Sequence, residues 1–137
     1  MDCKEFTKDL KDLPITGYVL ALDFSFLAPK ELYIHYPADW ARAYRDGGMA
    51  VRDPAFAWGL THTGFVLWKT LEDPDDVLAA ADRHGLGHGL TVACLTGGHR
   101  SFASLSTATP VTPAIGHRVL GALTRCHARA VAQPAYA

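Results

Sequence analysis

The chain of 137 residues has no long apolar run, no excess of one charge and no paired cysteine motif. No stretch approaches the roughly 20 consecutive apolar residues that span a bilayer, so we expect no contact with a membrane. With 13 Lys and Arg against 14 Asp and Glu, the formal net charge of −1 gives no basic footprint for nucleic acid. The polar N-terminus is not typical of a signal peptide. We therefore expect a cytoplasmic protein with one domain, residues 1–137.

Cysteine pairs and familiar catalytic motifs are also missing. Cys3, Cys94 and Cys126 lie far apart, which is typical of reduced thiols and not of a disulfide framework. No GxSxG sequence, phosphate-binding glycine loop or pair of catalytic carboxylates is present. His84 and His88 lie on either side of a helix stop without a Cys or carboxylate in a metal-binding pattern. We therefore predict no metal site and no cofactor, and an enzyme is the less favoured class.

Apolar spacing and turn residues predict an α+β fold. We expect an α-β-α sandwich with a central antiparallel sheet of about five strands flanked by helices. The clearest expected strands are apolar and β-prone, with a turn at 28–30 and another at Gly97-Gly98, and they cover residues 15–24, 31–36, 90–95 and 102–106. The expected helices have N-terminal caps, prolines or glycine stops at their ends, and they cover residues 2–12, 37–46, 54–63, 74–84 and about 113–132.

The stretch from Tyr36 to Trp68 combines large rings that carry polar groups with a carboxylate, Asp53. Trp40 and Tyr44 lie one turn apart on a predicted helix, so their rings share one face. A core is usually filled by Leu, Ile and Val, which have no polar atoms that need partners. This stretch therefore favours binding of an amphipathic small molecule.

The order of these residues resembles the ligand-binding domain of LuxR-type quorum-sensing regulators, which bind N-acyl-homoserine lactones. The resemblance covers roughly residues 16–107. The matching residues follow the family's order and spacing, and they are Tyr36, Trp40, Tyr44, Arg52, Asp53, Pro54, Trp68, Gly85, Leu86, Gly89, Leu90, Thr91 and Ser104 to Ser106. The resemblance implies a sensor for a small-molecule autoinducer in transcription regulation. It also implies a homodimer that contacts DNA only through a separate helix-turn-helix domain, which these residues do not contain.

The resemblance implies a role for each polar side chain. Trp40 matches an indole that donates to the lactone carbonyl, and Asp53 matches a carboxylate that accepts from the ligand's amide N–H. Tyr36 and Ser104 match hydroxyls that hold the acyl amide carbonyl. An amide and an ester present one donor and several acceptors, so one carboxylate and several donors are their chemical complement.

The apolar part of the pocket is less defined by the resemblance. Tyr44 and Trp68 match rings that pack around the acyl chain and the lactone. We expect the acyl chain, at about 0.8 kcal/mol for each buried methylene, to lie among apolar residues such as Val19, Leu20, Phe56, Ala81, Leu90 and Val92. Ala41 departs from the pattern, because some relatives carry there an Arg that reaches a 3-oxo group. The segment ahead of Tyr36 is shorter than in the family, which thins the wall over the acyl tail.

Other interpretations of the same residues stay open. Taken singly, Trp40 and Tyr44 fit core packing, and Asp53 before Pro54 fits a helix N-cap, so only the joint pattern favours a pocket. The long final helix is our predicted homodimer surface. A sensor without a helix-turn-helix would inhibit full-length regulators by forming heterodimers with them. A small hydrolase would use Cys94 or a histidine.

Overall fold

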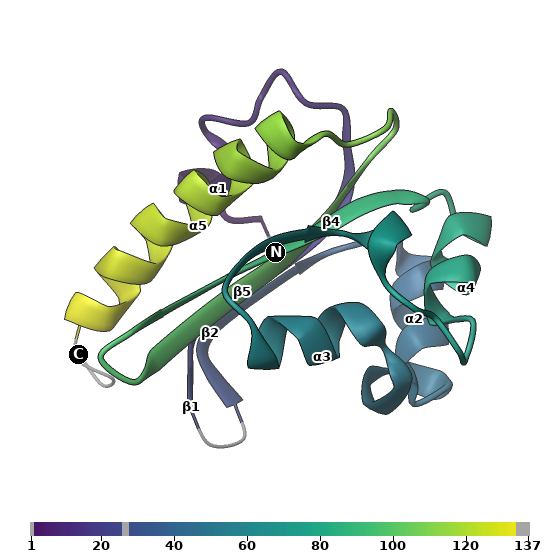
Figure 1. The fold of residues 1–137 in the computed structure, drawn as a ribbon, viewed down its shortest axis with the longest axis horizontal. Coiled ribbons are helices and arrows are strands. Elements are labelled where there is room, and N and C mark those ends of the chain that lie inside the picture. Colours follow the sequence, from purple (N-terminus) through teal and green to yellow (C-terminus); the bar gives the residue numbers. More distant parts are fainter. Residues whose placement is uncertain (1, 26–27, 134–137) are drawn as a thin grey trace.

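The structure is a computed structural model that describes residues 2–25 and 28–133, in which one antiparallel sheet lies between helices (Figure 1). Its five strands have the order β2-β1-β5-β4-β3. The strands are β1 (Ile15–Ser25), β2 (Ala28–His35), β3 (Gly64–Leu67), β4 (His88–Thr96) and β5 (His99–Thr107). The helices are α1 (Lys4–Thr7), α2 (Ala38–Asp46), α3 (Pro54–Thr61), α4 (Val77–Arg83) and α5 (Pro113–Ala132), with 3-10 turns η1 (Met49–Arg52) and η2 (Trp68–Thr70). The predicted α+β sandwich is confirmed.

The two faces of the sheet have different neighbours, because side chains alternate along each strand. The face under α5 is the main hydrophobic core, and it includes Tyr18, Leu20, Leu22, Leu90, Val92, Ala103 and Leu105. The opposite face turns toward α2, α3 and α4, and it includes Val19, Ala21, Phe102 and Ser104. The cross-strand pair of Val19 with Ser104 shows that neighbouring strands are in matching register on this face.

Helix α5 covers its face of the sheet over its predicted length, from Pro113 to Ala132. Its Thr112 cap accepts a hydrogen bond from the Ile115 N–H at 3.3 Å, and Val119 and Leu123 are fully buried. In the described part of the chain, no helix combines the length and the apolar character that a membrane span requires.

Two boundaries predicted near the N-terminus are wrong. The expected helix over 2–12 contracts to α1, although Phe6 and Leu10 are still buried in the core. A segment this short gains few helical hydrogen bonds for its conformational cost, and turns replace its second half. The expected turn at 28–30 is instead the start of β2, where Pro29 pairs with Phe24. β2 is an edge strand, so a residue without an N–H is tolerated there.

The helix expected directly after Asp73 begins later, at Val77. Asp73 nevertheless caps it, because its carboxylate accepts hydrogen bonds from the N–H groups of Val77 at 2.9 Å and Ala79 at 3.0 Å. Asp76, immediately before the helix, adopts a left-handed conformation with φ 58°. Asp73 therefore caps the helix as predicted, although the helix begins farther along the chain than expected.

Candidate functional site

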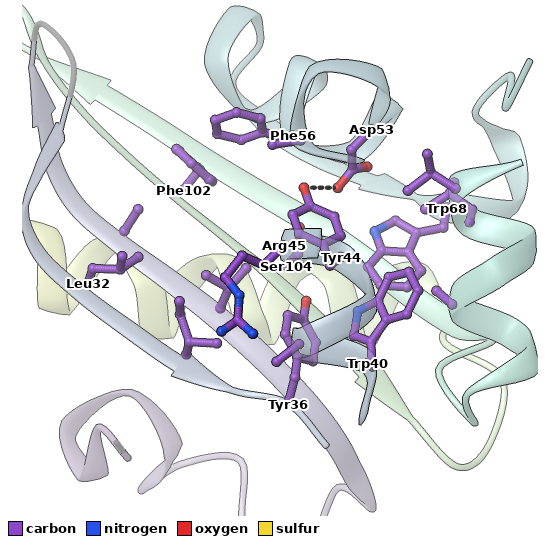
Figure 2. Close-up of a pocket in the computed structure, with 18 of the residues that line it drawn as sticks. Leu32, Tyr36, Trp40, Tyr44, Arg45, Asp53, Phe56, Trp68, Phe102 and Ser104 are labelled. Carbon is purple, nitrogen blue, oxygen red and sulfur yellow. Dashed lines mark hydrogen bonds between the residues drawn. The ribbon is translucent and has the colours of Figure 1, made fainter. Parts of the chain in front are cut away.

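A cavity of about 420 Å³ lies between the sheet and helices α2, α3 and α4 (Figure 2). Apolar side chains from the strands and helices form most of its wall, among them Val19, Leu32, Phe56, Ala81 and Phe102. All six residues singled out from the sequence also line it, namely Tyr36, Trp40, Tyr44, Asp53, Trp68 and Ser104. A largely apolar cavity with a few convergent polar groups is typical of small-molecule sites. The geometry brings these six residues together, and their contact with a ligand stays a prediction.

Asp53 supplies the carboxylate of the cavity and also caps α3. Its Oδ1 accepts from the Ala55 N–H at 2.8 Å. Its Oδ2 accepts from the Tyr44 O–H at 2.8 Å (Figure 2). Burial raises the pKa of the Asp53 carboxyl above its ordinary value, and the bonds from Tyr44 and the α3 backbone oppose that rise. The N-cap interpretation and the pocket interpretation therefore both hold for this residue.

Two donors on the cavity wall have no partner among the residues that the structure describes. The Trp40 side chain is 4% exposed, and neither its indole N–H nor the Tyr36 hydroxyl makes a hydrogen bond within this part of the chain. Every fully buried side-chain N or O atom there has a partner, so these two groups keep some accessible surface, and both side chains line the cavity (Figure 2). Burial and the nearby Asp53 raise the pKa of Tyr36, which keeps its hydroxyl protonated. Both groups are available to donate to a ligand.

Trp68, Thr91 and Ser104 form a hydrogen-bonded chain on the floor of the cavity. The Trp68 indole N–H donates to Thr91 Oγ1 at 3.0 Å, and the hydroxyls of Thr91 and Ser104 are 2.7 Å apart. Thr91 accepts from the indole, and in the arrangement in which Thr91 in turn donates to Ser104, the Ser104 proton is left for the cavity. Sequence reasoning gave Thr91 no role, although it belongs to the matched Gly89-Leu90-Thr91 sequence and pairs with Ser104 across the strands.

Glycines allow two of the rings to lie where they do. A Cβ on Gly17 would lie 2.5 Å from Cδ1 of Tyr36, and a Cβ on Gly89 would overlap the Trp68 ring. The aromatic wall therefore depends on two backbone positions without side chains.

The residues expected around an acyl chain divide between the two faces of the sheet. Val19, Phe56 and Ala81 line the cavity as expected. Leu20, Leu90 and Val92 lie instead in the core under α5, so their assignment to the cavity was wrong. Adjacent strand residues point to opposite faces of the sheet. Hydropathy identifies the more apolar residue of such a pair but does not show which of the two faces the cavity.

The cavity is open along the edge strand β2. Leu32 and Ile34 line it and are nevertheless 50% and 48% exposed, which agrees with a thin wall ahead of Tyr36. Arg45 also lines the cavity, with 74% of its side chain exposed. Sequence reasoning missed Arg45, which lies one helical turn after Ala41 and so brings a guanidinium near the position where Ala41 lacks one.

The groups considered for a hydrolase lie away from this cavity. Burial raises the pKa of the Cys94 thiol to about 11, so the thiolate is scarce near neutral pH. Ser101 Oγ lies 2.6 Å from His127 Nδ1, and Thr96 Oγ1 lies 2.7 Å from Nε2. Ser101 is fully buried and His127 is 2% exposed, so this pair offers a substrate no access. His127 therefore belongs to the buried face of α5.

A family profile described as the autoinducer binding domain matches residues 3–133. The chain belongs to this family. Autoinducer-binding domains are the sensors of LuxR-type quorum-sensing regulators, which are ligand-sensing transcription factors and not enzymes. The resemblance found in the sequence is confirmed. None of the curated protein sequences compared with this autoinducer-binding domain matches it.

Solved structures of LuxR-type regulators share the fold of this autoinducer-binding domain. Escherichia coli SdiA has 20% identity and a TM-score of 0.61, and the match covers 96% of this chain and 61% of SdiA. SdiA in complex with octanoyl-rac-glycerol has 20% identity and a TM-score of 0.59, with 98% and 64% covered. CepR2 from Burkholderia cenocepacia, an N-acylhomoserine lactone dependent LuxR family transcription factor, has 13% identity and a TM-score of 0.69, with 93% and 84% covered. The chain thus spans less than two thirds of the length of SdiA.

Proposed function

We propose that this autoinducer-binding domain binds an N-acyl-homoserine lactone, or a close mimic, in the cavity beside α2. The observation that supports this proposal most directly is the meeting of one carboxylate, Asp53, with two unpaired donors, Trp40 and Tyr36, in one apolar cavity. An acyl-homoserine lactone carries one amide N–H, two carbonyls and an apolar chain. Each kind of group therefore has a counterpart on the wall.

In the proposed complex, Asp53 accepts from the amide N–H and the Trp40 indole donates to the lactone carbonyl. Tyr36 and Ser104 donate to the acyl carbonyl. The acyl chain then extends between β1 and α3 toward the opening at Leu32. A tail longer than the cavity would emerge at that opening, beside the edge strand.

Binding in this cavity would couple sensing to folding. A ligand that fills this cavity of about 420 Å³ adds apolar contacts only in the folded state. Such a ligand stabilises the folded state by mass action, by about 2.7 kcal/mol at a concentration of 100 Kd.

We infer a homodimer through the outer face of α5, where Arg118 and Arg125 are exposed. Heterodimers with full-length relatives would use the same surface.

The direct test is to identify the bound molecule. The domain would be expressed in cells that make no lactone, with and without added acyl-homoserine lactones, and extracts of the purified protein analysed by mass spectrometry. We expect one added lactone to be retained in near-stoichiometric amount, with a higher unfolding temperature and dimers in sedimentation. A folded protein that retains no lactone and shows no thermal shift with any chain length would contradict the proposal.

Replacement of Trp40 by Phe is expected to weaken lactone binding by about 1–3 kcal/mol, roughly 5- to 150-fold. Phe keeps a ring on the wall and removes the N–H, so one ligand carbonyl loses its donor. Isothermal titration calorimetry with the retained lactone measures the change. Trp58→Phe is the matched control, because Trp58 stacks on His62 and does not line the cavity. Equal losses in the two variants would show that the Trp40 N–H is not a ligand contact.

Lactone affinity is also expected to decrease as the pH is lowered and Asp53 takes up a proton. Burial raises the pKa of Asp53 in the ligand-free protein, and a protonated carboxyl offers the amide no charged acceptor. A raised folded-state pKa has the opposite effect on the empty domain, whose stability should increase as pH falls through that pKa. Titration calorimetry and thermal unfolding between neutral and acidic pH measure both trends. A pH-independent affinity would contradict the role of the Asp53 carboxylate.

A further inference from the structure

Cys3, Glu5 and Cys126 meet where the N-terminal segment packs on α5, on the face of the sheet opposite to the cavity. Their two sulfur atoms and one carboxylate oxygen all lie within 4.8 Å of one another. Cys3 is 6% exposed and Cys126 is fully buried, whereas Glu5 is partly exposed and connects the cluster to solvent. Within residues 2–25 and 28–133, no other three metal-ligating side chains come this close together.

We propose that these three side chains bind a zinc ion. Thiolate sulfur and carboxylate oxygen are both zinc ligands, at about 2.3 Å and about 2.0–2.2 Å. Tetrahedral geometry with these bonds separates the ligand atoms by about 3.5–3.8 Å, so the cluster needs to contract by only about 1 Å. Two thiolates favour zinc over the hard cations magnesium and calcium, which prefer oxygen ligands.

The surroundings of the cluster orient two of the ligands. Arg129 donates from Nε at 3.1 Å and from Nη2 at 2.8 Å to Glu5 Oε1. Neither bond goes to Oε2, which leaves that oxygen for the ion. Arg129 also pairs with Glu31, so its charge is balanced without Glu5. The Cys3 N–H donates to the Tyr18 hydroxyl oxygen at 2.7 Å, which holds the backbone of that ligand in place.

Zinc binding would replace the two thiol protons, which are released to solvent as the two sulfur–zinc bonds form. A water molecule arriving beside Glu5 would complete four ligands. The ion would join the four-residue helix α1 to α5 and hold the N-terminal segment against the core. The site is independent of the lactone pocket, because none of its residues lines that cavity.

The test is a zinc chloride titration of the full chain, freed of metal with a chelator and kept reduced. We expect one zinc ion per chain by calorimetry and a thiolate-to-metal absorption band when cobalt replaces zinc. Cys3→Ser and Cys126→Ser should each weaken zinc binding by at least tenfold, and Glu5→Gln should weaken it less. Cys94→Ser is the matched control and should bind zinc like the wild type, since Cys94 is not in the cluster.

Thiol labelling of the wild-type chain keeps the proposal testable even where a variant fails to fold. Zinc should slow the reaction of Cys3 and Cys126 with a thiol reagent relative to the reduced, metal-free chain, and it should leave the reactivity of Cys94 unchanged. Unchanged zinc affinity in Cys3→Ser or in Cys126→Ser would overturn the site. So would a reduced protein that binds no zinc and forms a Cys3–Cys126 disulfide in air, with the loss of two hydrogens by mass spectrometry.

Discussion

Replacement of Asp53 by Asn is expected to weaken lactone binding by about 1.5–3 kcal/mol, roughly 10- to 150-fold, without harm to the empty domain. The amide oxygen of Asn still accepts one of the hydrogen bonds that Ala55 N–H and Tyr44 O–H now donate. It cannot replace the charge that strengthens the bond to the ligand's amide N–H. Isothermal titration calorimetry measures the loss of affinity.

The stability of the empty Asn variant separates a ligand contact from a structural role. Because burial raises the pKa of Asp53, its ionised form destabilises the folded state at neutral pH. The ligand-free variant should therefore unfold at the wild-type temperature or above it, while the thermal shift caused by lactone disappears. Asp73→Asn is the matched control, because Asp73 also caps a helix with two backbone bonds but lies outside the cavity wall. Its lactone affinity should be unchanged or slightly higher, because the Asp73 charge contributes to the raised pKa of Asp53. Full affinity in Asp53→Asn would contradict the proposed pocket chemistry.

The parts of the fold that the sequence predicted correctly depend on local signals. Thr112 before Pro113 is a cap followed by a proline, and α5 begins there. Trp40 and Tyr44 are one turn apart, and their ring centroids are indeed 5.7 Å apart. Asp53 before Pro54 caps α3, which turns its carboxylate toward the space beside α2. In each case the residues that determine the geometry are close together in the chain.

The features that the sequence did not predict depend on contacts between distant segments. The choice between Leu20 and Ala21 as a cavity residue requires the register of β1 against β5. The cluster of Cys3 with Cys126 forms only when the N-terminal segment packs on the last helix, with almost the whole chain between them. Local propensity carries no information on such pairs, so spacing motifs alone did not reveal them.

Replacement of Gly89 by Ala is expected to have the largest effect on the fold. A Cβ at position 89 would overlap the six-membered ring of Trp68, and Gly89 lies near the start of β4, paired with Ser106 of β5. Either the ring leaves the wall or β4 moves, and overpacking of this kind costs about 1–3 kcal/mol or more. Loss of the ring position would also break the bond from Trp68 to Thr91. We therefore expect a lower unfolding temperature and loss of lactone binding, measured by thermal unfolding with and without lactone.

Two further variants show whether the cause is the space occupied by Trp68. Gly121→Ala is the matched control, because a Cβ there meets nothing within 4 Å on α5, and it should stabilise the domain by up to about 1 kcal/mol. Trp68→Leu combined with Gly89→Ala removes the ring that the new methyl group would meet. The double variant should therefore be more stable than the sum of the two single changes predicts, because contacting residues are not additive. Strict additivity of the two changes would mean that Gly89 is required for its backbone conformation and not to make room for the Trp68 ring.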